Sequence, residues 1–215
     1  MLLTLKKIKR LGIMGGTFDP VHYGHLVAAE AARAQFDFDK VIFIPSGCPP
    51  HKIGKKITEA KHRYLMTVLA VSTNMYFEVN RTEIERQGQS YAFDTVFQLK
   101  EQYGSEWELY FITGADAVLE ILTWKNIKRL IEICTFVAAT RPGFDLSALD
   151  NKLEQISSIA KDKFFTFEVP ALSISSTDIR QKVADSKPIK YLLPESVEQY
   201  IYTNGLYKKR IITDK

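Results

Sequence analysis

The sequence predicts an α/β fold, in which helices cover both faces of one doubly wound, Rossmann-like parallel sheet. Three observations favour this class. Short apolar runs rich in β-forming residues alternate with longer runs of helical periodicity. The segments with unusual chemistry directly follow the apolar runs, which is where ligands bind in such sheets. The 215 residues, 46% of them hydrophobic, can furnish one substantial core.

The expected elements alternate along most of the chain. The strands are short apolar runs, and they cover residues 8–16, 40–47, 75–84, 107–116, 135–143 and 164–170. The helices show apolar residues at helical spacing, and they cover residues 25–36, 58–73, 93–104, 117–133 and 147–160. Thr58 is a plausible N-cap for the second of these helices, and Gly104 closes the third.

The C-terminal part, about residues 174–207, departs from this alternation. It predicts two short helices, over residues 175–184 and 194–207, that close the domain. The chain contains no internal repeat, low-complexity tract or obvious linker. We therefore expect a single domain over residues 1–215.

Composition narrows the classes of partner. The net charge is only +4, without a long block of like charge, which argues against nucleic acid but allows a local pocket for small anions. The first apolar run breaks after five residues and no later run could span a bilayer, so neither a signal peptide nor a membrane contact is expected. Cys48 and Cys134 lie in unlike contexts, which argues against a disulfide framework. We expect a soluble cytoplasmic protein, and self-association into a homo-oligomer is left open.

The loop after the first strand has the most distinctive chemistry. Gly15 and Gly16 allow a ligand to approach the backbone, and the helix that begins near His22 adds the positive end of its dipole. His22 and His25 are three residues apart, so both rings lie on one face near that helix start, where they can donate to phosphate oxygens. A single histidine is usually an ordinary packed residue, which is our interpretation of His62. The combination predicts a phosphate site.

Two common phosphate motifs are excluded. Gly54 and Lys55 suggest the end of a P-loop, but Pro49 stands where a glycine is needed, and Lys56 stands where serine or threonine would bind magnesium. No G-x-G-x-x-G follows the first strand, which argues against a dinucleotide dehydrogenase.

Two motifs carry a resemblance to a known superfamily. The segment GGTFDPVHYGH, residues 15–25, resembles the signature of the HxGH nucleotidyltransferases, and SISSTDIR, residues 173–180, resembles their second motif. Within the superfamily the chain is similar to bacterial nicotinate-nucleotide adenylyltransferases. The segments that carry this likeness are PPHK, IERQGQSYAFDT, ITGADAVLEILTW, RPG and YLLPESVEQYIYTNGLY, at residues 49–52, 84–95, 112–124, 141–143 and 191–207.

The resemblance implies a specific reaction. The 5′-phosphate of nicotinate mononucleotide attacks the α-phosphorus of ATP in line, giving deamido-NAD and pyrophosphate. No protein nucleophile is required, because a phosphate dianion can attack by itself and catalysis reduces to alignment and charge neutralisation. Mg²⁺ would come with ATP and bridge the leaving oxygens, and no metal ligands are assigned to the protein. The expected partners are ATP and nicotinate mononucleotide.

The resemblance also implies site residues. The catalytic residues would be His22, His25 and Arg180, with His25 the first choice for stabilising the transition state. The ATP contacts would be Gly15, Gly16, Thr17, Phe18, His22, His25, Gly114, Asp116, Ile174, Ser175, Ser176, Thr177 and Arg180. The mononucleotide contacts would be Gly16, Thr17, Lys52, Ser90, Tyr91, Ala92, Thr95, Trp124 and Arg141.

Several of these residues have expected roles. Lys52 would hold a phosphate as a point charge, and Arg180 would grip the β- or γ-phosphate. Asp116 would accept from ribose hydroxyls, although an aspartate just after a strand is also a common helix cap and could serve both roles. Trp124 would stack on the pyridine ring. An ordinary exposed side chain is the alternative for Arg180.

The acid form of the pyridine ring would be recognised by backbone N–H groups around Ser90, Tyr91 and Ala92, which favour a carboxylate over a carboxamide. Many family members have threonine where this sequence has Ala92, so one hydroxyl donor is missing. Plain core aromatics are the alternative interpretation for Tyr91 and Trp124.

Other function classes stay open at this point. A sibling transferase could use nicotinamide mononucleotide or phosphopantetheine, although residues 90–95 and Trp124 argue against the latter. His22, His25, Cys48 and His51 could form a zinc site, but their spacing fits no familiar finger. A nucleotide-sensing regulator would bind ATP without releasing pyrophosphate.

Overall fold

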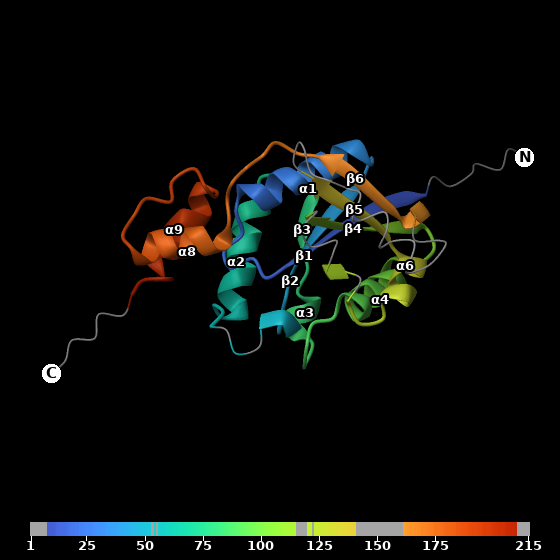
Figure 1. Ribbon diagram of the computed structural model, residues 1–215, viewed down its shortest axis with the longest axis horizontal. Coiled ribbons are helices and arrows are strands. Elements are labelled where there is room, and N and C mark those ends of the chain that lie inside the picture. Colours follow the sequence, from blue (N-terminus) through green and yellow to red (C-terminus); the bar gives the residue numbers. More distant parts are fainter. Residues whose placement is uncertain are drawn as a thin grey trace, which may run out of the picture.

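Six parallel strands form one sheet in the order β3-β2-β1-β4-β5-β6 (Figure 1). The structure is a computed structural model that describes residues 8–52, 54, 56–114, 120–121, 123–140 and 161–209. The strands are β1 (Lys9–Gly16), β2 (Lys40–Pro45), β3 (Phe77–Val79), β4 (Trp107–Gly114), β5 (Thr135–Thr140) and β6 (Phe164–Glu168). The chain runs outward from β1 to β3 and then returns to add β4 on the other side of β1. This order confirms the predicted doubly wound, Rossmann-like sheet.

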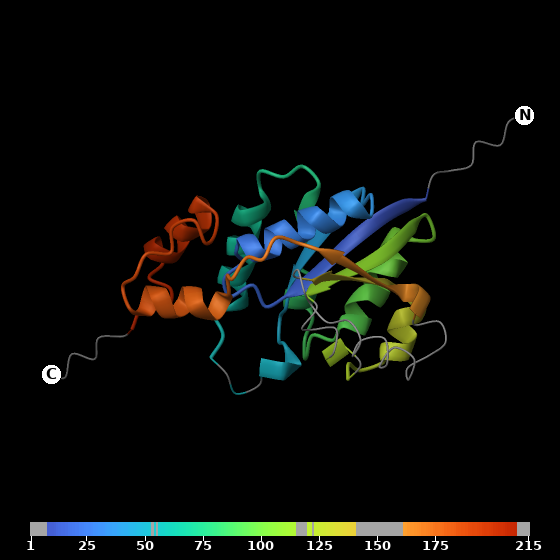
Figure 2. The same cartoon turned by 45° about the horizontal axis from the view of Figure 1, so that its top comes forward.

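Helices connect the strands and follow them at the C-terminal end. The described α-helices are α1 (Tyr23–Gln35), α2 (Ala60–Val71), α3 (Thr82–Glu85), α4 (Ala92–Tyr103), α6 (Ile127–Ile133), α8 (Ser176–Ala184) and α9 (Glu195–Thr203). Two short 3₁₀ turns are η1 (Pro50–Lys52) and η2 (Lys161–Lys163). Figure 2 shows α1 on one face of the sheet, with α4 and α6 on the other.

The alternation of side chains along the central strands builds one core on each face. In β1, Leu11 and Ile13 pack with the buried residues of α4 and α6, whereas Met14 packs with those of α1 and α2. In β2, Ile42 joins the first group and Phe43 the second. Since successive side chains of a strand point to opposite faces, two apolar faces follow directly from these runs.

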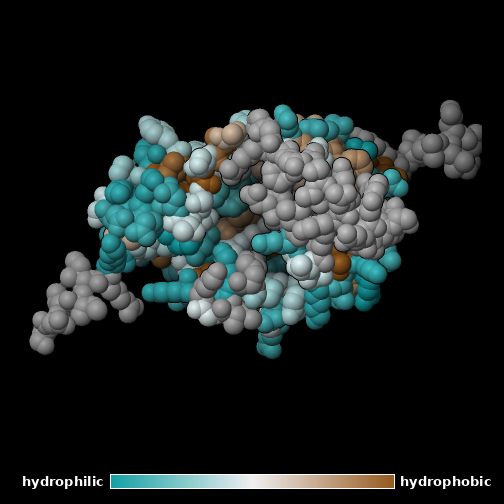
Figure 3. Space-filling view, viewed as in Figure 1, coloured by the Kyte–Doolittle hydropathy of each residue, from teal (hydrophilic) through white to brown (hydrophobic). Residues whose placement is uncertain are grey.

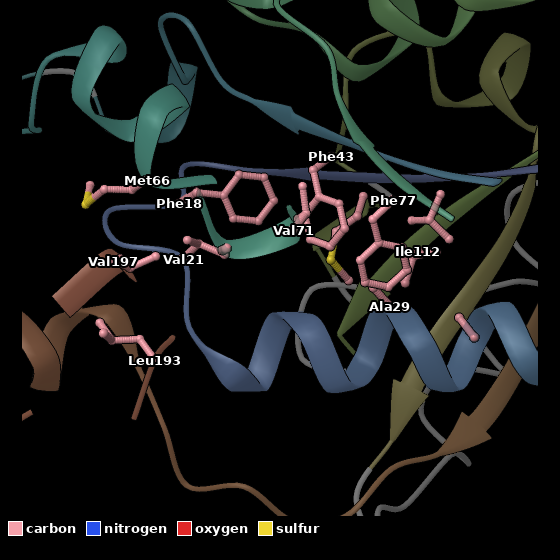
Figure 4. Close-up of a cluster of buried hydrophobic side chains, with 14 of the residues drawn as sticks. Phe18, Val21, Ala29, Phe43, Met66, Val71, Phe77, Ile112, Leu193 and Val197 are labelled. Atoms are coloured by element: carbon pink, nitrogen blue, oxygen red, sulfur yellow. The ribbon is translucent and has the colours of Figure 1, made fainter. Parts of the chain in front are cut away.

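The loop after β1 is held against the core by its own apolar side chains. Phe18 and Val21 are 2% and 0% exposed, and both point into the core on the α1 side (Figure 4). The ring of Phe18 lies 5.7 Å from that of Phe43. The loop is therefore fixed to the sheet by burial, although Phe18 has a left-handed backbone with φ of 49°.

The C-terminal helices share this core. Ile179, Val183, Val197 and Ile201 are buried in the same cluster as α1 and α2. Ser196 Oγ on α9 also donates to a backbone carbonyl of α2 at 3.3 Å. The expected helical closure is confirmed, and the division into a single domain stays a prediction. Within the part of the chain that the structure describes, no helix is long and apolar enough to cross a membrane.

Two sequence expectations were wrong in detail. The strand expected over residues 75–84 ends at Val79, because Asn80 Oδ1 accepts a bond from Thr82 N at 2.7 Å and starts the turn into α3. Thr58 does not cap α2, which begins at Ala60 with residue 59 in the cap position. These differences depend on local turn chemistry that apolar periodicity does not report.

The helix expected over residues 117–133 is also interrupted. In its described part a turn covers residues 123–126, and Asn126 has a left-handed φ of 61° at the start of α6. The expected helix over residues 147–160 lies outside the described residues. Gly104 does end α4, with φ of 71°, as predicted.

Gly47 should be the most substitution-sensitive glycine of the β2 loop. A Cβ atom there would lie 2.0 Å from the carbonyl oxygen of Glu83, so Gly47→Ala must push α3 away from β2. We expect a loss of about 1–3 kcal/mol in the free energy of unfolding, measured by urea denaturation. Gly114→Ala is the matched control, because a Cβ atom there meets nothing within 4 Å. Equal stability of the two variants would contradict this packing account.

Candidate functional site

The candidate site lies where the strand order reverses, between β1 and β4 at the carboxyl edge of the sheet. β1 ends at Gly16 and β4 at Gly114, which is exposed and has open space at its Cβ position. The face drawn in Figure 3 is hollowed next to the C-terminal helices, near where Figure 1 shows the loop between β1 and α1. The sheet therefore places the predicted phosphate loop at the expected edge.

The two histidines of this loop lie against each other. Their ring centroids are 3.8 Å apart at an angle of 30°, with His22 at the N-cap of α1 and His25 in its first turn. The backbone N–H of His22 donates to Nδ1 of His25 at 3.2 Å. Nδ1 of His25 is therefore an acceptor, so its ring proton lies on Nε2 and is available as a donor. The predicted pairing of the rings on one face is confirmed.

The rings are held in place by what surrounds them. Phe18 packs edge-on against His25 at 5.1 Å between centroids. A Cβ atom on Gly24 would lie 3.0 Å from two atoms of the His22 ring, so only glycine leaves that ring its position. Nδ1 of His22 is buried and makes no hydrogen bond to any described residue. A buried polar atom without a partner is unusual in proteins, which marks this ring as a candidate for ligand contact.

Both histidines are neutral at neutral pH. Burial lowers the pKa of His22 from 6.5 to about 4. Burial, and then the nearby charge of His22, lower the pKa of His25 well below its usual value. The pair can therefore donate hydrogen bonds without repelling each other before an anion binds.

Gly15 and Gly16 have a packing reason as well as the one predicted. A Cβ atom on Gly16 would lie 2.8 Å from the ring of Phe18, and one on Gly15 would lie 3.2 Å from Phe111. The glycine pair therefore admits the protein's own aromatic rings beside the strand. Close approach of a ligand to this backbone stays a prediction.

The second motif docks onto the first. Arg180 on α8 donates through Nη1 to the carbonyl of Asp19 at 2.6 Å, and Ser176 Oγ donates to the carbonyl of Pro20 at 2.8 Å. The start of α8 is thus joined to the loop that precedes the histidines. Segments about 160 residues apart in sequence are therefore in direct contact, and their shared role at a triphosphate stays a prediction.

The hydroxyls of this motif are engaged inside the protein. Ser175 caps α8 by accepting from Asp178 N at 3.1 Å, and Thr177 Oγ1 accepts from Arg180 Nη2 at 3.2 Å. Arg180 uses two of its five N–H donors in its bonds to Asp19 and Thr177. Ser175 and Thr177 only accept in these bonds and keep their hydroxyl protons. These two hydroxyls, the backbone N–H groups at the start of α8 and the rest of the Arg180 guanidinium are therefore the candidates for anion contact here.

Sequence reasoning missed a buried arginine below the site. Arg63 is 1% exposed and donates to three carbonyls, those of Thr17 and Thr58 at 2.8 Å each and that of Gly47 at 3.3 Å. It thereby joins the loops after β1 and β2. Its position on the buried face of α2, in line with Met66, was the available signal, because a charged residue within an apolar stripe is rare unless partnered.

Asp19 and Tyr207 were also missed. The Asp19 carboxylate accepts from Thr58 N at 3.2 Å and from the Tyr207 hydroxyl at 2.8 Å. Burial, followed by the charge of Asp19, raises the pKa of Tyr207, so this hydroxyl stays protonated and keeps donating. The sequence gives no signal for a contact between residues so far apart in the chain.

Part of the predicted mononucleotide set lies around the β2 loop. Ser90 Oγ accepts from the backbone N–H groups of Gly47 and Cys48 at 3.1 Å each, and Tyr91 lies under Lys125 Nζ at 4.3 Å. Ala92 is the first residue of α4, and Lys52 ends η1. The structure thus brings residues 90–92 beside the loop after β2.

Two of these residues are packed within the protein. Thr95 is 2% exposed, and its hydroxyl bonds inside the protein. Trp124 is half-buried and meets Phe111 edge-on at 5.6 Å between centroids. Ile174 is likewise half-buried against the core, and its carbonyl lies near Gly24.

Some expectations lie outside what the structure describes. Asp116 and Arg141 are outside the described residues, and so is the side chain of His51. Within the described part of the chain, no three histidine, cysteine, aspartate or glutamate side chains gather where they could hold a metal ion.

Known proteins match this chain over most of its length. A model of the cytidylyltransferase-like family matches residues 13–182. A protein of Thermoanaerobacter sp. (strain X514) named "Probable nicotinate-nucleotide adenylyltransferase" is 59% identical over 200 residues, which are 93% of this chain and 95% of the relative. The chain belongs to the cytidylyltransferase-like family, among the nicotinate-nucleotide adenylyltransferases. A relative of the same name from Moorella thermoacetica is 58% identical, covering 94% of this chain and 93% of the relative. The resemblance predicted from the motifs is confirmed.

Solved structures show the same fold. Plasmodium falciparum nicotinic acid mononucleotide adenylyltransferase, complexed with NaAD, superposes with a TM-score of 0.74 at 21% identity. The alignment covers 93% of this chain and 97% of that chain. The same enzyme complexed with APC gives a TM-score of 0.73. The family's fold is therefore retained across distant sequences.

The burial of His22 should make stability depend on pH. The unfolded chain takes up a proton on this residue near pH 6.5, whereas the native state does so only near pH 4. The native state is therefore destabilised as the pH falls between these values, by up to about 3 kcal/mol from His22. In His22→Asn this part of the pH dependence should disappear.

Urea unfolding of the wild type and of His22→Asn at about pH 7 and about pH 4 measures this effect. The carboxylates of the protein contribute equally to both curves, so the difference between the two proteins reports the burial of His22 together with its effect on His25. The same fall in stability for both proteins would show that the His22 ring is not buried as described.

Proposed function

We propose that the protein joins nicotinate mononucleotide to ATP, giving deamido-NAD and pyrophosphate. The observation that carries the proposal is the pair of stacked, neutral histidines at the start of α1, joined to the α8 motif by the bond from Arg180 to Asp19. The relatives' name, nicotinate-nucleotide adenylyltransferase, supports the same reaction. Both motifs lie at the edge of the sheet where ligands bind.

The reaction requires that the two substrates be aligned and that the negative charge on the phosphates be neutralised. The mononucleotide phosphate attacks the α-phosphorus of ATP, the bond to the β-phosphate oxygen breaks, and pyrophosphate leaves with the electron pair. Nε2–H of His25, the buried ring of His22 and the amino end of α1 would donate to the phosphate oxygens as charge builds. Because the triphosphate is an anion, it would also raise the pKa values of both rings.

Arg180 would complete the phosphate site from the opposite side. Its bond to the Asp19 carbonyl holds the guanidinium at the loop, and its further N–H groups would meet the β- or γ-phosphate. The amino end of α8, where the Ser176 hydroxyl donates to the Pro20 carbonyl, would add a second helix dipole. Two helix starts and two motifs would thus surround one triphosphate.

Mg²⁺ would arrive as part of the substrate, magnesium-ATP. The described lining of the phosphate site consists of imidazole, guanidinium and backbone N–H donors, which do not suit a magnesium ion. The nearby Asp19 carboxylate already accepts bonds from Thr58 and Tyr207. The ion would therefore be held by phosphate oxygens and water, and would stabilise the leaving pyrophosphate.

The adenine and pyridine rings would occupy separate parts of the carboxyl edge of the sheet. Adenosine would lie over Gly114, where the surface beside β4 is open, with Asp116 toward the ribose. The pyridine ring would lie between Trp124 and residues 90–92. The backbone N–H of Ser90 bonds to the Cys48 carbonyl, so those of Tyr91 and Ala92 would meet the carboxylate. Lys52 and Arg141 would meet the mononucleotide phosphate. Since both substrates are phosphorylated metabolites of the cytoplasm, we expect the protein to act there.

Pyrophosphate release is the direct test of this reaction. With magnesium-ATP, the wild-type protein should release pyrophosphate with nicotinate mononucleotide and much less with nicotinamide mononucleotide, because backbone donors oppose a carboxamide NH₂. A reaction without mononucleotide serves as the blank. ATP binding without pyrophosphate release would instead indicate a nucleotide sensor, and equal release with both substrates would show that the chain does not select the acid.

Replacing His25 should lower kcat strongly. His25→Ala removes both ring nitrogens, whereas His25→Asn keeps an acceptor for the backbone N–H of His22 and loses only the Nε2 donor. We expect kcat to fall by about 10²–10³ in both variants, the cost of removing one donor aimed at developing charge. His62→Ala is the control and should retain its rate, because this ring bonds to Tyr200 of α9 and has no contact with His22 or His25 among the described ones.

Circular dichroism and thermal unfolding check that the His25 variants fold. Normal turnover in His25→Asn would remove this nitrogen from the mechanism. If kcat falls in His25→Ala but is normal in His25→Asn, the role of His25 is to hold the loop. In that case the rate needs only the acceptor for the His22 N–H.

A further inference from the structure

Glu83 is a buried carboxylate beside the expected mononucleotide site, and the proposed reaction has not used it. It lies in the short helix α3 and is 7% exposed. Burial raises its pKa, while hydrogen bonds from Thr95 and Ser90 and the charge of Arg86 oppose that rise. A carboxylate in such a position is stable only if its oxygens are bonded, so its partners indicate its role.

Thr95 is the first of these partners. Its hydroxyl donates to Glu83 Oε1 at 2.8 Å and accepts from Arg86 Nη1 at 3.0 Å, while Thr95 itself is 2% exposed. The proton of this hydroxyl therefore points to Glu83, and Arg86 occupies a lone pair. Thr95 lies in the first turn of α4, so Glu83 fixes the start of that helix.

Ser90 is held in the same way at the other end of the segment. Its oxygen accepts from the backbone N–H groups of Gly47 and Cys48 at 3.1 Å each, and its hydroxyl bonds to Glu83. The backbone N–H of Ser90 donates in turn to the Cys48 carbonyl at 2.9 Å. The segment from Ser90 to Thr95 is thus tied to Glu83 at both ends.

The backbone of Glu83 is fixed as well as its side chain. Its carbonyl oxygen lies 2.0 Å from the position of a Cβ atom on Gly47, so α3 rests directly on the β2 loop. Side-chain bonds and backbone packing together leave the carboxylate little freedom to move. The hydroxyls of Ser90 and Thr95 are both turned inward, which leaves the backbone N–H groups between them for a ligand on the outer side.

We propose that Glu83 is a positioning residue for the mononucleotide. By engaging the hydroxyls of Ser90 and Thr95, it sets the segment between them so that backbone N–H groups meet the carboxylate of the pyridine ring. This inference rests on the proposed function and adds a residue that does not touch the substrate. It also gives a reason for a buried carboxylate beside residues 84–95, a segment whose motif predicted only contacts to the ligand.

Glu83→Gln tests the proposal with little change in shape. The amide oxygen can still accept from Thr95, but the NH₂ group cannot accept from Ser90. We expect KM for nicotinate mononucleotide to rise about tenfold while KM for ATP changes less than about twofold, the effect of losing one hydrogen bond to a charged group. Glu85→Gln is the matched control, since that carboxylate is on the same helix but pairs with Arg81 at the surface.

Thr95→Val removes the hydroxyl that donates to Glu83, and so breaks the same contact at its other partner. It should raise KM for the mononucleotide similarly, and combining it with Glu83→Gln should add little, because both changes break one network. If Glu83→Gln does not fold, as judged by circular dichroism, Thr95→Val alone decides. An equal rise in both KM values, or fully additive effects, would overturn the proposal and assign Glu83 to general stability.

Calorimetric titration with nicotinate mononucleotide separates this inference from the reaction itself. If the wild type binds the mononucleotide but releases no pyrophosphate, the proposed function fails, and weaker binding by Glu83→Gln still supports the role of Glu83. If wild type and Glu83→Gln bind it equally, Glu83 does not position the segment. Absence of binding to the wild type overturns both.

Discussion

A buried guanidinium is the constraint on which the site depends. Among the described residues, the hydrogen-bond partners of Arg63 are three backbone carbonyls. They belong to three segments: Thr17 after β1, Gly47 after β2 and Thr58 before α2. Burial lowers the pKa of Arg63, and the charge of Asp19 opposes that shift. An unpaired charge would be costly here, so the three segments are held at the positions that satisfy it.

From this centre the two substrate regions are built by different contacts. On one side, Asp19 and Pro20 receive the C-terminal helices through Arg180, Ser176 and Tyr207. On the other side, Gly47 is bonded to Ser90 and so to the start of α4. Both regions meet one rigid sheet, so their separation is set by the spacing of parallel strands and not by flexible loops.

Periodicity and motif spacing predicted the part of the molecule that depends on local sequence. The six strands, the helix that begins beside His22 and the stacked histidine pair follow from runs and spacings of fewer than fifteen residues. Motif resemblance supplied the prediction that the segment around Arg180 also meets phosphate. The turn at Asn80 was missed, because a single side-chain oxygen ended the strand where β-forming residues continued.

The hidden polar contacts could not be predicted from the sequence. Ser90 and Thr95 were expected at the ligand, and their hydroxyls instead bond to Glu83. Whether a hydroxyl points outward or inward depends on a partner brought near by the tertiary fold, so spacing along the chain does not fix it. The roles of Asp116 and Arg141 stay predictions, since both lie outside the described residues.

The bond from Tyr207 to Asp19 has a consequence for synthesis on the ribosome. It joins residues 188 positions apart, so the loop after β1 is made early but receives its last partner only when the C-terminal segment emerges. Long-range contacts of this kind form late, because the intervening chain must first be ordered. The strands and α1 can therefore assemble during translation, while the nascent chain stays without a finished phosphate site. Any nucleotide turnover would begin only once Tyr207 has reached Asp19.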